Sequence, residues 1–171
     1  MNRRRSHRCR GARGLARARF AASRLPPVVE VLDRQRTARI SPVRVSTFVE
    51  FALERLKLHG AQVTIVLVGE RAMRALNSRW RGKDRPTDVL SFSQREGEGG
   101  GLHPEVLGDV VICVPVARRQ AREAGHCLAA ELDRLAVHGL LHLAGFEHED
   151  DPVAARAMRR REDAIIRGWR G

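Results

Sequence analysis

The chain has few cysteines and few lysines, and it lacks a long apolar run. Its three cysteines lie far apart among 171 residues, and their odd number implies no disulfide framework, so we expect a protein of the reducing cytoplasm. No apolar run approaches the roughly 18–20 residues that cross a bilayer, which predicts a soluble chain without a membrane partner. Hydrophobic residues make up 43% of the sequence, enough for the core of one domain.

Acidic residues are absent from positions 1–24, which contain nine arginines. Subtracting these nine from the formal charge of +12 leaves +3 for the remainder, so most of the positive charge belongs to this tail. Because the tail has few apolar residues, we expect residues 1–25 to form a disordered Arg-rich extension and residues 26–171 to form a single domain. Three explanations of the tail remain open: a targeting peptide, a phosphate-binding arm, or a translation start assigned too far upstream.

The spacing of apolar residues predicts strands and helices that are interleaved along the domain. The expected strands are 28–32, 62–68, 89–92 and 107–114. The expected helices are 42–58, 70–77, 115–124, 128–144 and 152–167, the last closed by Gly168. A polar loop is expected at 79–88 and a flexible Gly-rich loop at 94–105. Since two strands are neighbours across the Gly-rich loop, we predict an α+β fold in which a small mixed β-sheet is packed with helices.

Three histidines stand at H-x3-H-x5-H spacing within VHGLLHLAGFEH, residues 137–148. His138 and His142 are four apart, which places them on one face of a helix. Gly145 is expected to end that helix in a left-handed conformation, so that His148 approaches from the loop side. Three imidazoles leave the fourth corner of a tetrahedron for water, as in catalytic zinc sites. Histidines that only hydrogen-bond to the backbone are the alternative.

Carboxylates near these histidines have two readings each. Glu131, two turns before His138, is either a carboxylate that orients a ligand imidazole or a solvated surface residue. Glu147 either assists proton transfer or holds the loop by a hydrogen bond. Gly139 occupies the place of the glutamate base in H-E-x-x-H zinc peptidases, so a peptidase is not expected.

A basic segment lies before the third predicted strand, where Arg79, Arg81, Lys83 and Arg85 alternate around Trp80. Cations with an interleaved aromatic suit single-stranded nucleic acid, because the cations hold phosphates and the indole stacks on a base. An arginine beside a metal also stabilises charge on a phosphoryl oxygen. A solvated turn with its tryptophan packed on the core fits the same pattern, and the sequence leaves both open.

Two segments together resemble the signature stretches of the YbeY family of bacterial endoribonucleases. They are LNSRWRGKDRPTDVLSF (residues 76–92) and HGLLHLAGFEH (residues 138–148), and LGDVVIC (residues 107–113) is similar to the strand between them. The resemblance runs from about residue 28 to residue 168. Phe146-Glu147 stands where the family usually has Tyr-Asp, and Ser93 replaces a common proline; neither change affects an expected ligand.

The resemblance implies a zincin-like metal helix and a single-strand-specific endoribonuclease that matures the 3′ end of small-subunit ribosomal RNA and serves ribosome quality control. Carried over by position, His138, His142 and His148 bind one zinc ion, and Arg81 is the functional arginine. Lys83 and Arg85 are expected to guide the RNA strand. The expected partners are single-stranded RNA, ribosomal RNA and the ribosome, without a nucleotide cofactor. The alternative is a non-catalytic, RNA-binding ribosome-assembly factor whose zinc is structural.

Overall fold

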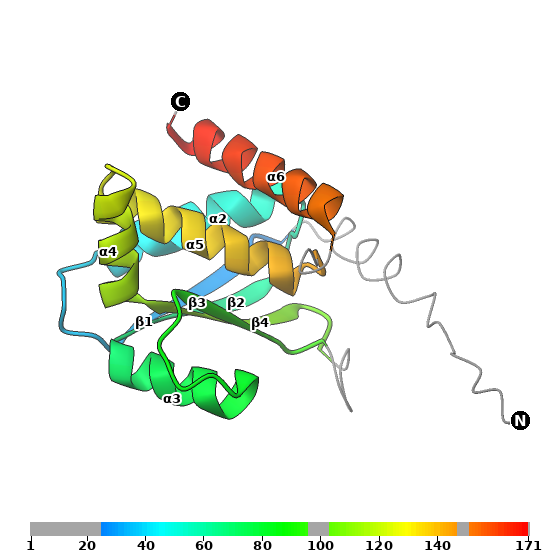
Figure 1. Cartoon of the computed structure of the whole chain (residues 1–171). Helices are drawn as coiled ribbons and strands as arrows, with labels where there is room; N and C mark the ends of the chain where they lie inside the picture. Colours follow the sequence, from blue (N-terminus) through cyan, green and yellow to red (C-terminus); the bar gives the residue numbers. More distant parts are fainter. Residues whose placement is uncertain (1–24, 96–102, 147–150, 171) are drawn as a thin grey trace, which may run out of the picture.

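A four-stranded mixed sheet lies at the centre of the structure, a computed structural model that describes residues 25–95, 103–146 and 151–170 (Figure 1). The strands lie in the order β1 (Val28–Asp33), β2 (Gln62–Val68), β4 (Val106–Cys113) and β3 (Val89–Ser93). The first three are parallel to their neighbours, whereas β3 is antiparallel to β4 and lies at the edge of the sheet. The predicted α+β fold with a small mixed sheet is confirmed.

Helices cover both faces of this sheet (Figure 1). One face carries α3 (Glu70–Arg81), and the other carries α2 (Pro42–Arg55) and α5 (Leu128–Leu143). Outside these two lies α6 (Pro152–Arg170), while α4 (Val114–Glu123) follows β4 directly and contacts α5. As a result α5 is enclosed by the sheet, α2, α4 and α6, which explains why its sequence is apolar around most of its circumference.

Alternation of side chains along the strands divides the core in two. Val110 of β4 faces the larger core, which it shares with Leu140 of α5. Its neighbour Val111 faces the smaller core, where it joins Leu90 of β3 and Met73 of α3. Each helix layer is thus attached to the sheet by its own apolar cluster, and the edge strand β3 contributes to the α3 side.

Most predicted elements are observed, but three helix ends differ by three or more residues. The helix predicted at 70–77 is longer than expected, because residues 79–81, predicted as the start of a polar loop, form the last turn of α3; Gly82, with φ 66°, caps it. The first helix ends at Arg55 rather than residue 58, because Lys57 adopts a left-handed φ of 60°. Gly168 does not close α6, which continues to Arg170. Apart from Leu25, the predicted extension lies outside the described residues, as does most of the Gly-rich loop. Among the described helices, none has the length and apolar character needed to cross a membrane.

The backbone of α5 approaches the sheet closely at Gly139. A Cβ built there would lie 2.5 Å from Cγ1 of Val110 and 3.1 Å from Oγ of Ser91. The Ser91 hydroxyl donates a hydrogen bond of 3.3 Å to the Gly139 carbonyl. Because valine is stiff at χ1, its methyl cannot swing away cheaply. The absence of a side chain at position 139 therefore sets the distance between the helix and strands β3 and β4.

We expect Gly139→Ala to lower the free energy of unfolding by about 1–3 kcal/mol, the usual cost of overpacking a core. Alanine is intrinsically a better helix former than glycine by about 1 kcal/mol. Any decrease in the free energy of unfolding therefore results from the steric clash at position 139. Urea unfolding followed by circular dichroism measures it.

Gly168→Ala is the matched control, because its Cβ would lie 3.5 Å from Cζ of Phe51, an ordinary contact. That variant should be as stable as the parent or more so. Equal behaviour of the two variants would show that the approach at Gly139 is not tight.

Candidate metal centre

Two histidines of α5 converge at the side of the helix that faces the sheet edge. His138 and His142 lie one turn apart, with their Nε2 atoms 3.1 Å from each other and their ring centroids 4.7 Å apart. Two nitrogens bound at 2.0–2.1 Å to one tetrahedral zinc ion would be separated by about 3.3–3.4 Å. The observed separation is within a few tenths of an ångström of that value, so the pair fits two positions of a metal site.

The third predicted ligand, His148, and the neighbouring Glu147 lie outside the described residues. The predicted left-handed end of the helix is observed, since Gly145 follows it with φ 84° and its amide donates to the His142 carbonyl at 2.8 Å. Within residues 25–95, 103–146 and 151–170 there is no group of three or more His, Cys, Asp or Glu side chains that could hold a metal. The three-histidine site therefore remains a prediction.

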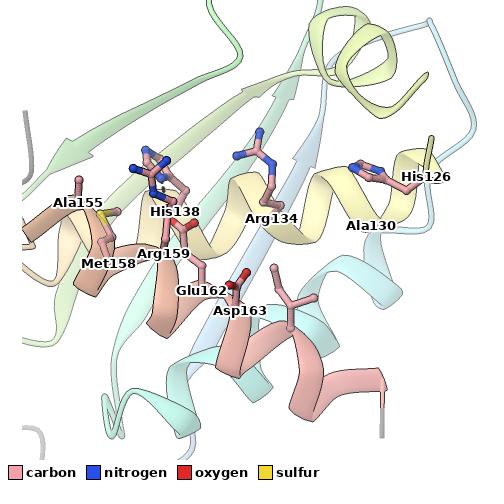
Figure 2. Close-up of a pocket in the computed structure, with 10 residues that line it drawn as sticks. His126, Ala130, Arg134, His138, Ala155, Met158, Arg159, Glu162 and Asp163 are labelled. Atoms are coloured by element: carbon pink, nitrogen blue, oxygen red, sulfur yellow. Dashed lines mark hydrogen bonds and ion pairs between the residues drawn. The ribbon is translucent and has the colours of Figure 1, made fainter. Parts of the chain in front are cut away.

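A buried carboxylate orients the first of these imidazoles. Nδ1 of His138 lies 2.8 Å from Oε1 of Glu162 on α6, and Glu162 is only 7% exposed (Figure 2). When Nδ1–H donates to this carboxylate, the lone pair of a neutral imidazole is on Nε2, the atom that faces His142. Carboxylate–histidine pairs of this kind fix the tautomer and raise the basicity of metal ligands.

Glu131 does not have the orienting role considered for it. Its carboxylate is 1% exposed and accepts a hydrogen bond of 3.0 Å from Nε of Arg134, with Nε2 of His126 at 3.1 Å. The surface alternative is wrong as well, because Glu131 is buried. Sequence reasoning missed Glu162, although a signal existed: the residue shares one helical face with Met158 and Ile165, two buried apolar side chains.

The basic segment and the histidines line one cavity of about 600 Å³. Arg81 and Trp80 line it from the end of α3, the edge strand β3 forms part of its wall, and His138 and His142 line it from α5. Lys83 and Arg85, the other two cations predicted to contact RNA, are exposed but do not line this cavity. The predicted approach of the basic segment to the histidines is thus observed for Arg81.

Trp80 is not packed into the core. It is 60% exposed, with its ring edge-on to Phe92 at a centroid distance of 5.8 Å and the Arg79 guanidinium 5.3 Å from its centroid. The packed-tryptophan alternative for this segment is therefore wrong. An exposed indole beside a cavity is available for stacking.

Asp88 supplies a negative group in the cavity wall. Burial raises the pKa of its carboxyl, but hydrogen bonds from Gln120, Thr87 and the Val89 amide outweigh burial and hold the pKa below its usual value. Asp88 is consequently ionised at neutral pH, and these bonds attach β3 to α4 through Gln120.

A family model described as "Endoribonuclease YbeY" matches residues 30–170. The chain belongs to the YbeY family. Endoribonuclease YbeY of Aquifex aeolicus is 38% identical over 80% of this chain and 89% of that protein. The protein of the same name from Anaeromyxobacter sp. strain Fw109-5 is 51% identical over 63% of this chain, and the match spans about half (54%) of that protein.

One solved structure has the same fold. The solution structure of TM1509 from Thermotoga maritima aligns with a TM-score of 0.57 and 25% identity, covering 84% of this chain and 92% of TM1509. Together with the family match over residues 30–170, this likeness confirms the predicted resemblance.

We expect Glu162→Gln to weaken the binding of a zinc ion by about 10- to 100-fold, the usual effect of removing a carboxylate behind a ligand histidine. Competition with a chromophoric chelator measures the affinity. Asp163→Asn is the control, because this neighbouring acid is exposed.

Glu131→Gln separates the two candidate carboxylates, and it should leave zinc affinity within about threefold of the parent. A larger loss from Glu131→Gln than from Glu162→Gln would reverse the assignment.

Proposed function

We propose that the chain is a zinc-dependent endoribonuclease that cleaves single-stranded RNA, with His138, His142 and His148 as ligands of one zinc ion. Membership of the YbeY family places the chain among enzymes that hydrolyse RNA phosphodiester bonds, as the resemblance implied. The observation that carries the proposal for this site is the shared cavity, which Arg81 lines together with the convergent histidine pair.

Some residues of the cavity would stabilise negative charge, and others would orient the groups that react. His138, His142 and His148 would hold a zinc ion, which would supply Lewis-acid stabilisation of a phosphoryl oxygen and activate water at neutral pH. Glu162 holds His138 in the tautomer that presents Nε2. Arg81 places a permanent positive charge where negative charge develops on the phosphate. The exposed Trp80 stacks on a base, a contact worth about 1–3 kcal/mol.

The structure argues against a peptidase built on the same helix. In H-E-x-x-H enzymes the base follows the first histidine, and here that position is Gly139. Any side chain at 139 would collide with Val110 at 2.5 Å, so a glutamate does not fit there without moving the helix. A nuclease with cationic groups around the metal needs no base at this position.

We further propose a cellular role in ribosomal RNA processing in the cytoplasm, including maturation of the small-subunit 3′ end and ribosome quality control. Lys83 and Arg85 are exposed near the cavity, which supports a role in guiding the strand toward it. Three histidines would also accept nickel or copper, so the native metal is a matter for measurement.

The test is cleavage of a labelled single-stranded RNA by purified protein that is stripped with chelator and then reloaded with zinc. Cleavage should vanish on stripping and return with zinc. His142→Ala should lower the rate by about 100-fold or more, because the loss of several kcal/mol of metal stabilisation corresponds to at least that factor. His103→Ala is the control, because this exposed histidine lies outside the cavity.

The outcomes separate the candidate functions. Cleavage that is unchanged by stripping and by His142→Ala would contradict the proposal. Zinc-dependent folding and RNA binding without cleavage would favour the assembly-factor alternative. A 2′,3′-cyclic phosphate on the product would identify the RNA's own 2′-hydroxyl, rather than water, as the nucleophile.

A further inference from the structure

A second cavity lies between α5 and α6 (Figure 2). Its volume is about 640 Å³, and its wall includes Arg159, Met158 and Ala130. His138 and Arg134 are the two residues that line both this cavity and the one that contains Arg81. His138 therefore borders two cavities, and Arg134 lies at their junction.

Arg134 is held in position by a buried acid. Its Nε and Nη2 atoms donate to the same oxygen of Glu131, at 3.0 and 2.5 Å, and His126 contacts the other oxygen of Glu131 at 3.1 Å. The Glu131 side chain is only 2% exposed, whereas the Arg134 side chain is 39% exposed. A guanidinium that is fixed on one edge and open on another is preorganised for a planar anion.

The open edge is the Nη1 side. Nη1 of Arg134 has no hydrogen-bond partner within the described part of the chain. Arg134 lies one turn before His138, on the same face of α5. Two acids near the guanidinium have other partners: Glu162 contacts His138, and Asp88 accepts hydrogen bonds from Gln120 and Thr87. A third acid, Asp163, also lines the cavity between α5 and α6 and is exposed. The hydrogen bond to Glu131 raises the pKa of Arg134 despite its burial, so its charge is permanent.

We propose that Arg134 is a second phosphate-binding residue of the RNA site, contacting a backbone phosphate next to the one that faces Arg81 and the histidines. The proposal rests on the function proposed above. An RNA strand would then pass from the cavity at β3, across His138, into the cavity between α5 and α6. Glu131 is the positioning residue that keeps the guanidinium at this junction.

The test compares a double variant with a matched control whose acid is on the same helix. Arg134→Gln combined with Glu131→Gln removes the ion pair but leaves two amides that can hydrogen-bond. The control combines Arg44→Gln, on α2, with Asp133→Asn, on α5. That pair also has two hydrogen bonds, at 2.8 and 2.7 Å, and its exposures of 37% and 3% nearly equal those of Arg134 and Glu131. It lines neither cavity.

Binding is measured by fluorescence anisotropy with zinc-loaded protein and a labelled 2′-O-methyl single-stranded oligonucleotide, checked to be intact afterwards. The Arg134 double variant should bind about 10-fold more weakly, since hydrogen bonds to charged groups contribute at this level. Its slope of log K against log salt should fall by about 0.7, the value for one phosphate contact on a single strand. The control should keep both values.

Cleavage of natural RNA supplies the second readout. Because the contact is to a neighbouring phosphate, the double variant should raise KM about 10-fold with kcat changed by less than about threefold. Arg134→Lys should keep the salt slope, because its charge remains, and should recover part of the affinity. Partial rescue of this kind is not expected from a residue that only supports the fold.

The outcomes distinguish this inference from the proposed function. Parental affinity and salt slope in the Arg134 double variant would overturn it, and so would an equal loss in the Arg44 control. Parent protein that binds RNA but never cleaves it would end the nuclease proposal, while the binding comparison would still decide the role of Arg134. Parent protein that binds no RNA would overturn both.

Discussion

The contact between α5 and the sheet at Gly139 positions the rest of the site. With hydrogen as its side chain, this residue lets the helix backbone lie against Val110 and accept a bond from Ser91. His138 is its immediate neighbour, and His142 is one turn further along, so both imidazoles reach the cavity beside the edge strand β3. A helix held further from the sheet would carry the histidines away from the end of α3, where Arg81 enters the same cavity.

Charge pairing then fixes the rotation of α5 about its axis. The buried acid Asp133 of α5 accepts two hydrogen bonds from Arg44 of α2. Since a buried carboxylate without a partner is strongly destabilising, rotations that separate this pair are disfavoured. The bond from His138 to Glu162 adds a second constraint, between α5 and α6. Together these contacts restrict the histidines more closely than apolar packing alone, which tolerates small rotations.

Local sequence patterns predicted the features that depend on interactions between residues close in sequence. Apolar spacing located every described strand and helix, and the left-handed Gly145 was recognised as the end of the histidine helix. The extra turn of α3 was missed because residues 79–81 add no buried apolar side chain to the helical pattern, and Gly82, with φ 66°, was taken as part of a loop that had already begun. Glu162 was missed for a different reason. Its partner lies 24 residues away on another helix, and only tertiary packing brings the two together.

The same packing explains why Glu131 was assigned the wrong partner. On an isolated helix Glu131 lies on the same face as His138. Arg134 lies between them in sequence, however, and donates two hydrogen bonds to the Glu131 carboxylate. The two buried acids therefore have different roles: Glu162 orients the imidazole of His138, and Glu131 holds the guanidinium of Arg134. A second cation besides Arg81 is thereby kept in the cavity that the histidines line. Two positive groups at a candidate metal site suit a polyanion, since successive phosphates can each meet a cation, whereas a neutral peptide would gain nothing from this arrangement.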